Sequence, residues 1–348
     1  MEYIGLDVHK QYTVACILEK DTGEARFVKL NNLRSEFVKL FNKYGQQQTV
    51  LEASSYSYQV FDLIEDLVSE IQIANPSKVR AIAEASIKTD KIDALTLARL
   101  LSAGYIPQTY IRSRDNRTVI GQLHQRMFLV RSRTRIKNRI HSFFDSQPEA
   151  VRRDQPRKRD LFGKAGRRWL NQAALPAAED KMLKNMLQFL DNHDVLIKES
   201  DGWIKELFLS DPIAQRLATI PGIGQFLAVL IRHEIDDIGR FRDVKKLHAY
   251  AGMVPGTKSS GGKTYHGKLV KNCNHILKWA LIEAVWPAIQ GDPWLKSMYL
   301  KKKKHKHYNI ARTLVAKNIL TLVYKVWTEN RDYLPVKPLT NNAAVRQP

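Results

Sequence analysis

Four carboxylates in three separate segments occupy positions from which they could share one cation. Asp7 and Glu52 each follow a short run of apolar and β-branched residues. Asp90 and Asp93 are three residues apart at the start of a helical pattern, so they share one helix face. Crowded carboxylates repel one another, and a hard divalent cation relieves that repulsion. The pattern predicts a Mg²⁺ site, in which two ions roughly 3.5–4 Å apart would clamp a phosphoryl group during in-line displacement.

Each of these positions also has an ordinary structural explanation. An acidic residue at the end of a strand is commonly a turn residue or a solvated charge, and Asp90 stands where a helix N-cap is expected. The residues alone leave both interpretations open.

A second reactive residue type is the serine of a Ser-Ser-Gly-Gly string. Ser260 precedes two glycines. A serine hydroxyl is a weak nucleophile and needs a nearby base or metal, which the acidic cluster would supply if the two parts of the chain meet. The string by itself is more typical of a flexible loop. Basic side chains that could stabilise a phosphate flank it: Lys258, Lys263, Lys268 and Lys271.

The first 110 residues contain the elements that would position the carboxylates. We expect, in order, strands at 3–8, 12–18 and 25–30, a helix at 33–44, a strand at 49–52, a helix at 58–69 and a strand at 71–74. This order is required of an RNase H-like α/β domain whose first three strands form an antiparallel meander. It places Asp7 on the first strand, Glu52 at the end of the fourth, and a helix at 90–102 over the sheet.

The middle of the chain predicts two long helices, at 115–145 and 177–209, that pack as an antiparallel hairpin. The basic segment between them, 152–168, contains Pro and Gly and is predicted to be a loop. The first helix carries a one-signed set of charges that favours nucleic-acid contact over a merely solvated face, which usually alternates signs. These residues are Arg126, Arg131, Arg133, Arg135, Lys137 and Arg139.

Residues 217–231 resemble a helix-hairpin-helix element. Gly222 and Gly224 lie in its turn, where backbone N–H groups at a helix N-terminus suit a DNA phosphate. A plain turn between two helices uses the same residues. A last helix is expected at 309–327, and the tail is polar.

Charge is unevenly distributed along the chain. The net charge of +21 indicates a polyanionic partner. Residues 1–110 hold 12 basic and 14 acidic side chains, whereas residues 111–170 hold 17 basic and 5 acidic. The first domain is therefore not the main electrostatic anchor.

Cys16 and Cys273 are the two cysteines, too few for a disulfide framework or a four-Cys zinc site. The N-terminus lacks a signal-peptide pattern, and no stretch of about 18 apolar residues occurs. We expect a cytoplasmic protein, associated with the nucleoid of a prokaryote, with no membrane partner.

The motifs occur in an order that resembles one protein family. Gly5-Leu6-Asp7-Val8-His9-Lys10, then Leu51-Glu52-Ala53-Ser54, then 88–94, resemble the DEDD motif of transposases of the insertion-sequence one-hundred-and-ten family. The strings at 220–224, 251–255 and 259–261 resemble that family's second conserved region. The resemblance covers about residues 1 to 330.

This resemblance implies a fold, a division into domains and a set of functional residues. The implied domains are a RuvC-like, RNase H-fold DEDD domain at 1–110, a basic coiled-coil arm at 111–210, a mainly helical, serine-bearing transposase domain at 211–330, and a polar tail at 331–348. The four carboxylates would bind Mg²⁺, Ser260 would be the nucleophile, and Lys10 would lie near the DNA.

The activity implied is DNA strand exchange by a mobile element. The partners would be donor and target DNA, a structured guide RNA known as a bridge RNA, and further copies of the chain in a dimer or tetramer. Two alternatives remain: a junction-resolving nuclease that cuts by water attack without using Ser260, and a non-catalytic nucleic-acid-binding relic.

Overall fold

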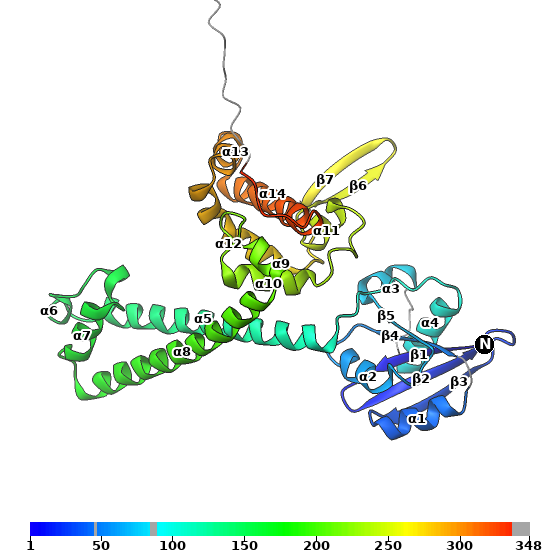
Figure 1. Ribbon diagram of the computed structural model, residues 1–348. Helices are drawn as coiled ribbons and strands as arrows, with labels where there is room; N and C mark the ends of the chain where they lie inside the picture. Colours follow the sequence, from blue (N-terminus) through cyan, green and yellow to red (C-terminus); the bar gives the residue numbers. More distant parts are fainter. Residues whose placement is uncertain (45–46, 84–88, 336–348) are drawn as a thin grey trace, which may run out of the picture. The chain divides into compact units, whose positions relative to one another are not determined.

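The computed structural model describes residues 1–44, 47–83 and 89–335. The chain divides into two compact units, Met1–Arg112 and the residues from Ser113 onward. Unit 1 holds a five-stranded sheet with helices, and unit 2 is mainly helical (Figure 1).

Unit 1 is built on a mixed sheet with strand order β3-β2-β1-β4-β5, in which β1 is central. The first three strands pair antiparallel, and β4 and β5 add in parallel. The order of strands and helices predicted from the sequence is confirmed through β5 and again at α4, whereas α3 was not predicted. The elements are β1 (Glu2–Val8), β2 (Tyr12–Glu19), β3 (Ala25–Asn31), α1 (Arg34–Asn42), β4 (Gln47–Glu52), α2 (Ser57–Ile64), β5 (Glu70–Ala74), α3 (Pro76–Ile82) and α4 (Asp90–Ser102).

Helices cover both faces of this sheet, which gives three layers. Ile4, Leu6 and Leu51 pack with α1 and α2 on one face. Tyr3 and Val50 pack with α4 on the other face. Because successive strand residues point to opposite faces, this alternation places Asp7 and Glu52 on the α4 side of the sheet.

A glycine allows α4 to lie directly against the central strand. A Cβ on Gly5 would stand 2.1 Å from the carbonyl oxygen of Ala94 and 2.6 Å from the backbone nitrogen of Ala98. Only glycine permits so close an approach of strand to helix. The N-cap of α4 is Thr89, whose Oγ1 accepts the N–H of Ile92, so the expectation that Asp90 is the cap is wrong.

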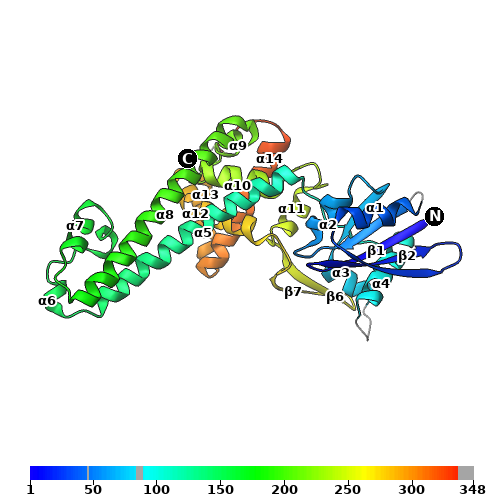
Figure 2. The ribbon, with the colours of Figure 1, turned by 90° about the horizontal axis from the view of Figure 1, so that it is seen from below.

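Unit 2 consists of a two-helix arm, a helical body and a hairpin. The helices α5 and α8 lie side by side for most of their length (Figures 1 and 2). The elements of unit 2 are α5 (Arg114–Asp145), α6 (Glu149–Arg152), η1 (Lys158–Asp160), α7 (Lys164–Gln172), α8 (Ala177–Ser210), α9 (Pro212–Leu217), α10 (Gln225–Ile235), α11 (Val244–Tyr250), β6 (Pro255–Ser260), β7 (Lys263–Leu269), α12 (His275–Gly291), α13 (Pro293–Lys303) and α14 (Tyr308–Thr328).

The end of the arm has its own small core. Phe144 from α5 and Leu187 from α8 pack with Leu161 and Leu170 from the connection between these two helices. The loop predicted at 152–168 is therefore wrong from residue 164, where α7 begins. Apolar residues in this segment drive helix formation and packing, although its charges dominate its composition.

The body of unit 2 is a helical core that includes the start of the predicted tail. Helices α10, α12 and α14 contribute most of its buried residues. The Tyr333 hydroxyl donates to Asp292 at 2.6 Å, and the Tyr333 backbone N–H donates to Thr219 Oγ1 at 2.8 Å. The remainder of the predicted tail, 336–348, lies outside the described residues.

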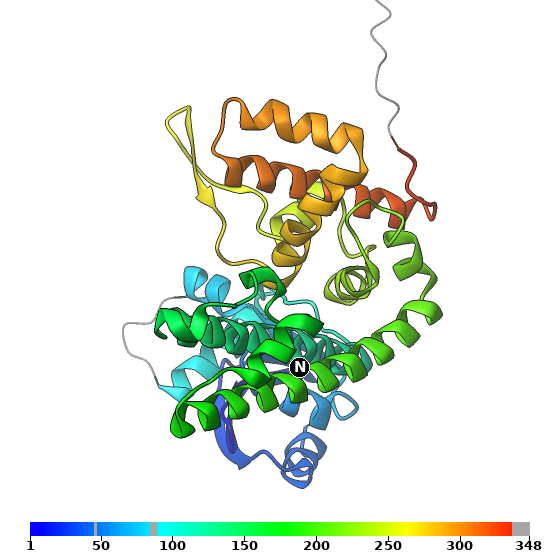
Figure 3. The same ribbon diagram turned by 90° about the vertical axis from the view of Figure 1, so that its left-hand side faces the viewer.

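Strands β6 and β7 form a hairpin that extends away from the helices of its own unit (Figures 1 and 3). Ser260 pairs with Lys263, and Gly261 and Gly262 between them have φ angles of 56° and 75°. Two successive positive φ angles are the geometry of a two-residue hairpin turn, which glycine adopts without strain. A paired β-hairpin thus stands where the Ser-Ser-Gly-Gly string alone predicts a flexible loop.

The two cysteines lie in different environments. Cys16 is fully buried in β2, and this burial raises the pKa of its thiol to about 11. Cys273 is partly exposed at the residue before the N-cap of α12.

Candidate metal centre and serine hairpin

Three side chains of unit 1 converge at the end of β1. His9 Nε2 lies 3.1 Å from Asp7 Oδ2 and 3.3 Å from Asp90 Oδ2. The ligand atoms of these three residues all lie within 4.8 Å of one another. A pair of carboxylates with an imidazole is a donor set suited to a divalent cation.

His9 was not among the residues predicted for this site. The turn after β1 returns it beside Asp7, and the backbone carbonyl of His9 accepts the side-chain N–H of Asn32 at 2.8 Å. The Tyr12 ring packs on the His9 ring at 4.6 Å, and the Tyr12 hydroxyl donates to Asp90 Oδ2 at 3.2 Å. The spacing Asp-x-His at a strand end was the available signal, but it is too short to be diagnostic.

The other two predicted ligands lie nearby but outside this close set. Asp93 is one helical turn after Asp90, and its charge helps to raise the pKa of Asp7. Glu52 follows Leu51, which pairs with Leu6 in the parallel register, so Glu52 is across from Asp7 on the neighbouring strand. The fold thus places all four predicted carboxylates on the α4 side of the sheet, near the C-terminal ends of β1 and β4.

The pKa of Asp7 is raised chiefly by its burial, and neighbouring carboxylates add to that effect. These are Asp90 and Asp93, whose charges repel that of Asp7, whereas His9 lowers the pKa. A cation would offset this repulsion. The donors and their crowding therefore fit a divalent cation.

Ser260 lies at the exposed tip of the hairpin. Its cross-strand partner is Lys263, so the two side chains share one face of the hairpin. Ser259 points to the other face, where its hydroxyl lies 3.2 Å from that of Thr264. Lys268 and Lys271 are exposed farther from the tip, and the Lys258 side chain is outside the described atoms.

The predicted basic residues of α5 fall into two sets. Three pack within unit 2: Arg126 pairs with Asp201 at 2.8 Å, Arg133 pairs with Asp194 at 2.9 Å, and Lys137 lies over the Phe162 ring. Exposed residues at four-residue intervals make up the second set, which we call the outer arginines: Arg131, Arg135 and Arg139. Arg131 also contacts the Trp279 ring.

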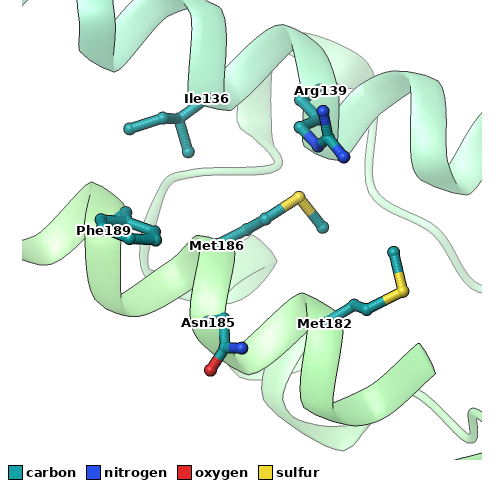
Figure 4. Close-up of a pocket in the computed structure, with 6 residues that line it drawn as sticks. All are labelled: Ile136, Arg139, Met182, Asn185, Met186 and Phe189. Atoms are coloured by element: carbon teal, nitrogen blue, oxygen red, sulfur yellow. The ribbon is translucent and has the colours of Figure 1, made fainter. Parts of the chain in front are cut away.

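One outer arginine borders a pocket between the two arm helices. Arg139 and Ile136 from α5 face Met186 and Phe189 from α8 across it (Figure 4). The Phe189 side chain is exposed. The arm thus presents cationic and apolar groups beside one another.

The remaining residues predicted to contact nucleic acid differ in how exposed they are. Lys10 is exposed in the turn between β1 and β2, next to His9. Gly224 is exposed as the N-cap of α10. Gly222 lies against α12, where a Cβ would stand 2.2 Å from the Ala284 carbonyl oxygen. In the described structure this glycine therefore allows close packing of its turn on α12.

Comparison with known proteins identifies the class of molecule and then its family. Residues 4–147 match the DEDD model of IS110 elements, described as Transposase, and residues 214–300 match the model described as Transposase IS116/IS110/IS902 family. The chain is therefore a transposase, a class that acts on DNA. It belongs to the IS110/IS116 family.

Relatives of this family match over most of the chain. The putative transposase y4qE of Sinorhizobium fredii is 24% identical over 296 residues, which are 82% of this chain and 71% of that protein. The transposase for insertion sequence element IS1111A of Coxiella burnetii is 22% identical over 338 residues, which are 96% of this chain and 91% of that protein. Within the residues that the structure describes, no helix is long and apolar enough to span a membrane.

Proposed function

We propose that this protein cuts and rejoins DNA through a metal-dependent acidic site and a serine nucleophile. The observation that carries the proposal is the convergence of Asp7, His9 and Asp90 at the end of the central strand of unit 1. The strand order β3-β2-β1-β4-β5 supports an RNase H-like, RuvC-like assignment for this unit. Glu52 and Asp93 complete the proposed ligand set. Bound Mg²⁺ would supply Lewis-acid stabilisation of charge on a scissile phosphate.

The proposed covalent step uses the tip of the hairpin. Ser260 Oγ loses its proton to a base and forms a bond to the scissile phosphorus, while the bond from phosphorus to one deoxyribose oxygen breaks and that oxygen leaves as a hydroxyl after taking up a proton. The reverse attack by a hydroxyl end restores a phosphodiester, so no ATP is needed. Lys263 is placed on the same face to neutralise the phosphate.

The arm is the proposed contact for nucleic acid, including the guide RNA implied by the family resemblance. The outer arginines repeat every four residues on exposed turns of α5. Such a cationic stripe suits a phosphate backbone without specifying RNA or DNA. Further copies of the chain would be needed, because strand exchange joins two duplexes.

The test is a covalent-adduct assay with purified protein, Mg²⁺, the element's flanking noncoding RNA, and labelled donor and target DNA. Wild type is compared with Ser260→Ala, Ser259→Ala and Asp7→Asn, with Asp21→Asn in an exposed turn as the matched control. We expect adducts with wild type, Ser259→Ala and Asp21→Asn, and at least a roughly thousandfold loss with the other two variants. If the RNA guides the protein to its DNA site, omission of the RNA should abolish adducts at that site.

Two results would refute this mechanism. Metal-dependent cleavage without an adduct, unchanged in Ser260→Ala, would indicate a nuclease that uses water. DNA binding with no cleavage by wild type under any of these conditions would indicate a non-catalytic relic.

A further inference from the structure

A buried carboxylate connects helices of unit 2 at the base of the serine hairpin. The Glu234 side chain on α10 is 3% exposed. Its Oε1 lies 2.7 Å from Nε2 of His124 on α5, and its Oε2 accepts the side-chain N–H of Asn274 at 2.6 Å. A buried carboxylate is costly unless it is hydrogen-bonded, so Glu234 favours the positions in which both partners reach it.

Asn274 and Tyr250 close the segment that contains the hairpin. The Asn274 backbone N–H donates to the Tyr250 carbonyl at 2.8 Å, and the Asn274 side-chain amide donates to the Tyr250 hydroxyl at 3.0 Å. That hydroxyl donates to the backbone carbonyl of Glu234 at 3.1 Å. Tyr250 ends α11 and Asn274 caps α12, so the segment that contains the hairpin begins and ends beside this pair of residues.

His124 gives this network one end at the surface of the arm. Its side chain is 41% exposed, whereas the Glu234 side chain is almost fully buried. The path from α5 to the hairpin base therefore consists of a few short hydrogen bonds: His124 to Glu234, Glu234 to Asn274, and Asn274 to Tyr250.

We propose that Glu234 is a positioning residue that couples helix α5, through His124, to the hairpin that carries Ser260. This inference rests on the proposed role of Ser260 as nucleophile. Nucleic acid bound along α5 would then influence the orientation of the hairpin through His124. Glu234 itself does not need to contact DNA for this role.

The coupling can be tested in the whole 348-residue chain with two substitutions at one position. His124→Phe removes the donor to Glu234, whereas His124→Gln retains a side-chain N–H that can reach it. Asn116→Ala is the matched control, because Asn116 also joins α5 to α10, but through His233. Chemical denaturation of each variant separates a change in global stability from a local change.

The first readout is hydrogen exchange at the hairpin base, at the amides of Val270 and Asn274, which donate to the carbonyls of Val254 and Tyr250. We expect about tenfold faster exchange in His124→Phe at matched global stability, recovery in His124→Gln, and no selective change in Asn116→Ala. Unchanged exchange in His124→Phe, or an equal effect of Asn116→Ala, would overturn the coupling.

The second readout is the rate of adduct formation as DNA concentration is varied. Mispositioning should lower the rate at saturating DNA about tenfold in His124→Phe, leave the half-saturating DNA concentration unchanged, and be rescued in His124→Gln. A higher half-saturating concentration with an unchanged maximal rate would overturn the positioning role. If wild type forms no Ser260 adduct, the serine mechanism fails, while the exchange measurements still decide whether the coupling exists.

Discussion

The acidic cluster and the serine hairpin are held in place in different ways. Asp7 lies on the central strand of a sheet covered on both faces, and Asp90 begins a helix packed directly on that strand. Ser260 lies at the tip of an exposed two-stranded hairpin, a structure that is marginally stable alone. Core packing thus sets the geometry of the carboxylates, whereas the serine depends on the base of its hairpin and on whatever binds it.

Substitution of Gly5 should break the geometry of the acidic cluster most strongly. In Gly5→Ala the new methyl would clash with the Ala94 carbonyl, so α4 must move away from β1 and carry Asp90 with it. We expect about 10–100-fold weaker Mg²⁺ affinity and a loss of roughly 1–3 kcal/mol in unfolding free energy. Isothermal titration with Mg²⁺ and chemical denaturation measure these effects.

Gly121→Ala is the matched control, because Gly121 is a helical residue of α5 with open space around its added methyl. It should leave Mg²⁺ affinity unchanged and be neutral or slightly stabilising. Wild-type Mg²⁺ affinity in Gly5→Ala would show that packing of α4 on β1 does not set the metal site.

The two units should respond to acid in opposite directions. Burial lowers the pKa of His248 in unit 2 from 6.5 to about 4, with a smaller effect from Lys317. As pH falls below 6.5, His248 becomes protonated in the unfolded state but stays neutral in the folded state. Unit 2 therefore loses stability between about pH 6.5 and 4. The full loss from this residue is about 3 kcal/mol.

Asp7 in unit 1 has a raised pKa, chiefly through burial, so the folded state takes up its proton at a higher pH than the unfolded state. Acidification through that raised pKa therefore favours folded unit 1. Thermal and chemical unfolding from pH 7 to 4 should show a decline in unit 2 that flattens in His248→Gln. An equally steep decline in that variant would exclude His248 as its source.

Substitution of Lys263 tests whether the tip of the hairpin is a phosphate site. Lys263 is the cross-strand partner of Ser260, whereas Lys268 lies nearer the base. We expect Lys263→Ala to slow adduct formation about tenfold and Lys268→Ala to slow it less, because charge stabilisation falls with distance from the reacting phosphate. Equal effects of the two substitutions, measured as single-turnover rates, would contradict a specific role for Lys263.

Substitution of the arm arginines should have the smallest effect and should separate the two sets. Arg139→Ala is expected to lower the slope of log affinity against log salt by about 1, because one phosphate contact is lost. Arg133→Ala should leave the slope unchanged and cost about 0.5 kcal/mol of stability through its pair with Asp194. Binding titrations at several salt concentrations, with equal slopes for both variants, would refute the division into outer and paired arginines.

Much of unit 1 could be predicted because its signals are local. Alternation of apolar residues predicts β1 and β2, and a spacing of three places Asp90 and Asp93 on one helix turn. His9 could not be found in this way, because its approach to Asp90 depends on Gly5 bringing α4 against β1. That packing is a tertiary effect that no local pattern contains.

In unit 2, by contrast, local sequence patterns predict the long helices but not the contacts between distant residues. The long helices α5 and α8 follow from their periodicity, but the partners of Arg126 and Arg133 lie 75 and 61 residues away. The hairpin was missed because its strands are polar and exposed on both faces, so they lack the alternation that marks a half-buried strand. Its two glycines are the signal that could have predicted it.

The contrast between the two cysteines makes this protein suited to site-specific labelling without any substitution. A thiol-reactive fluorophore added to the folded protein should modify Cys273 and leave Cys16 untouched, since Cys16 is buried with a raised pKa. Cys273 immediately precedes Asn274, at the point where the hairpin segment rejoins the helical body. One dye on the native chain would therefore report hairpin movement as nucleic acid is added.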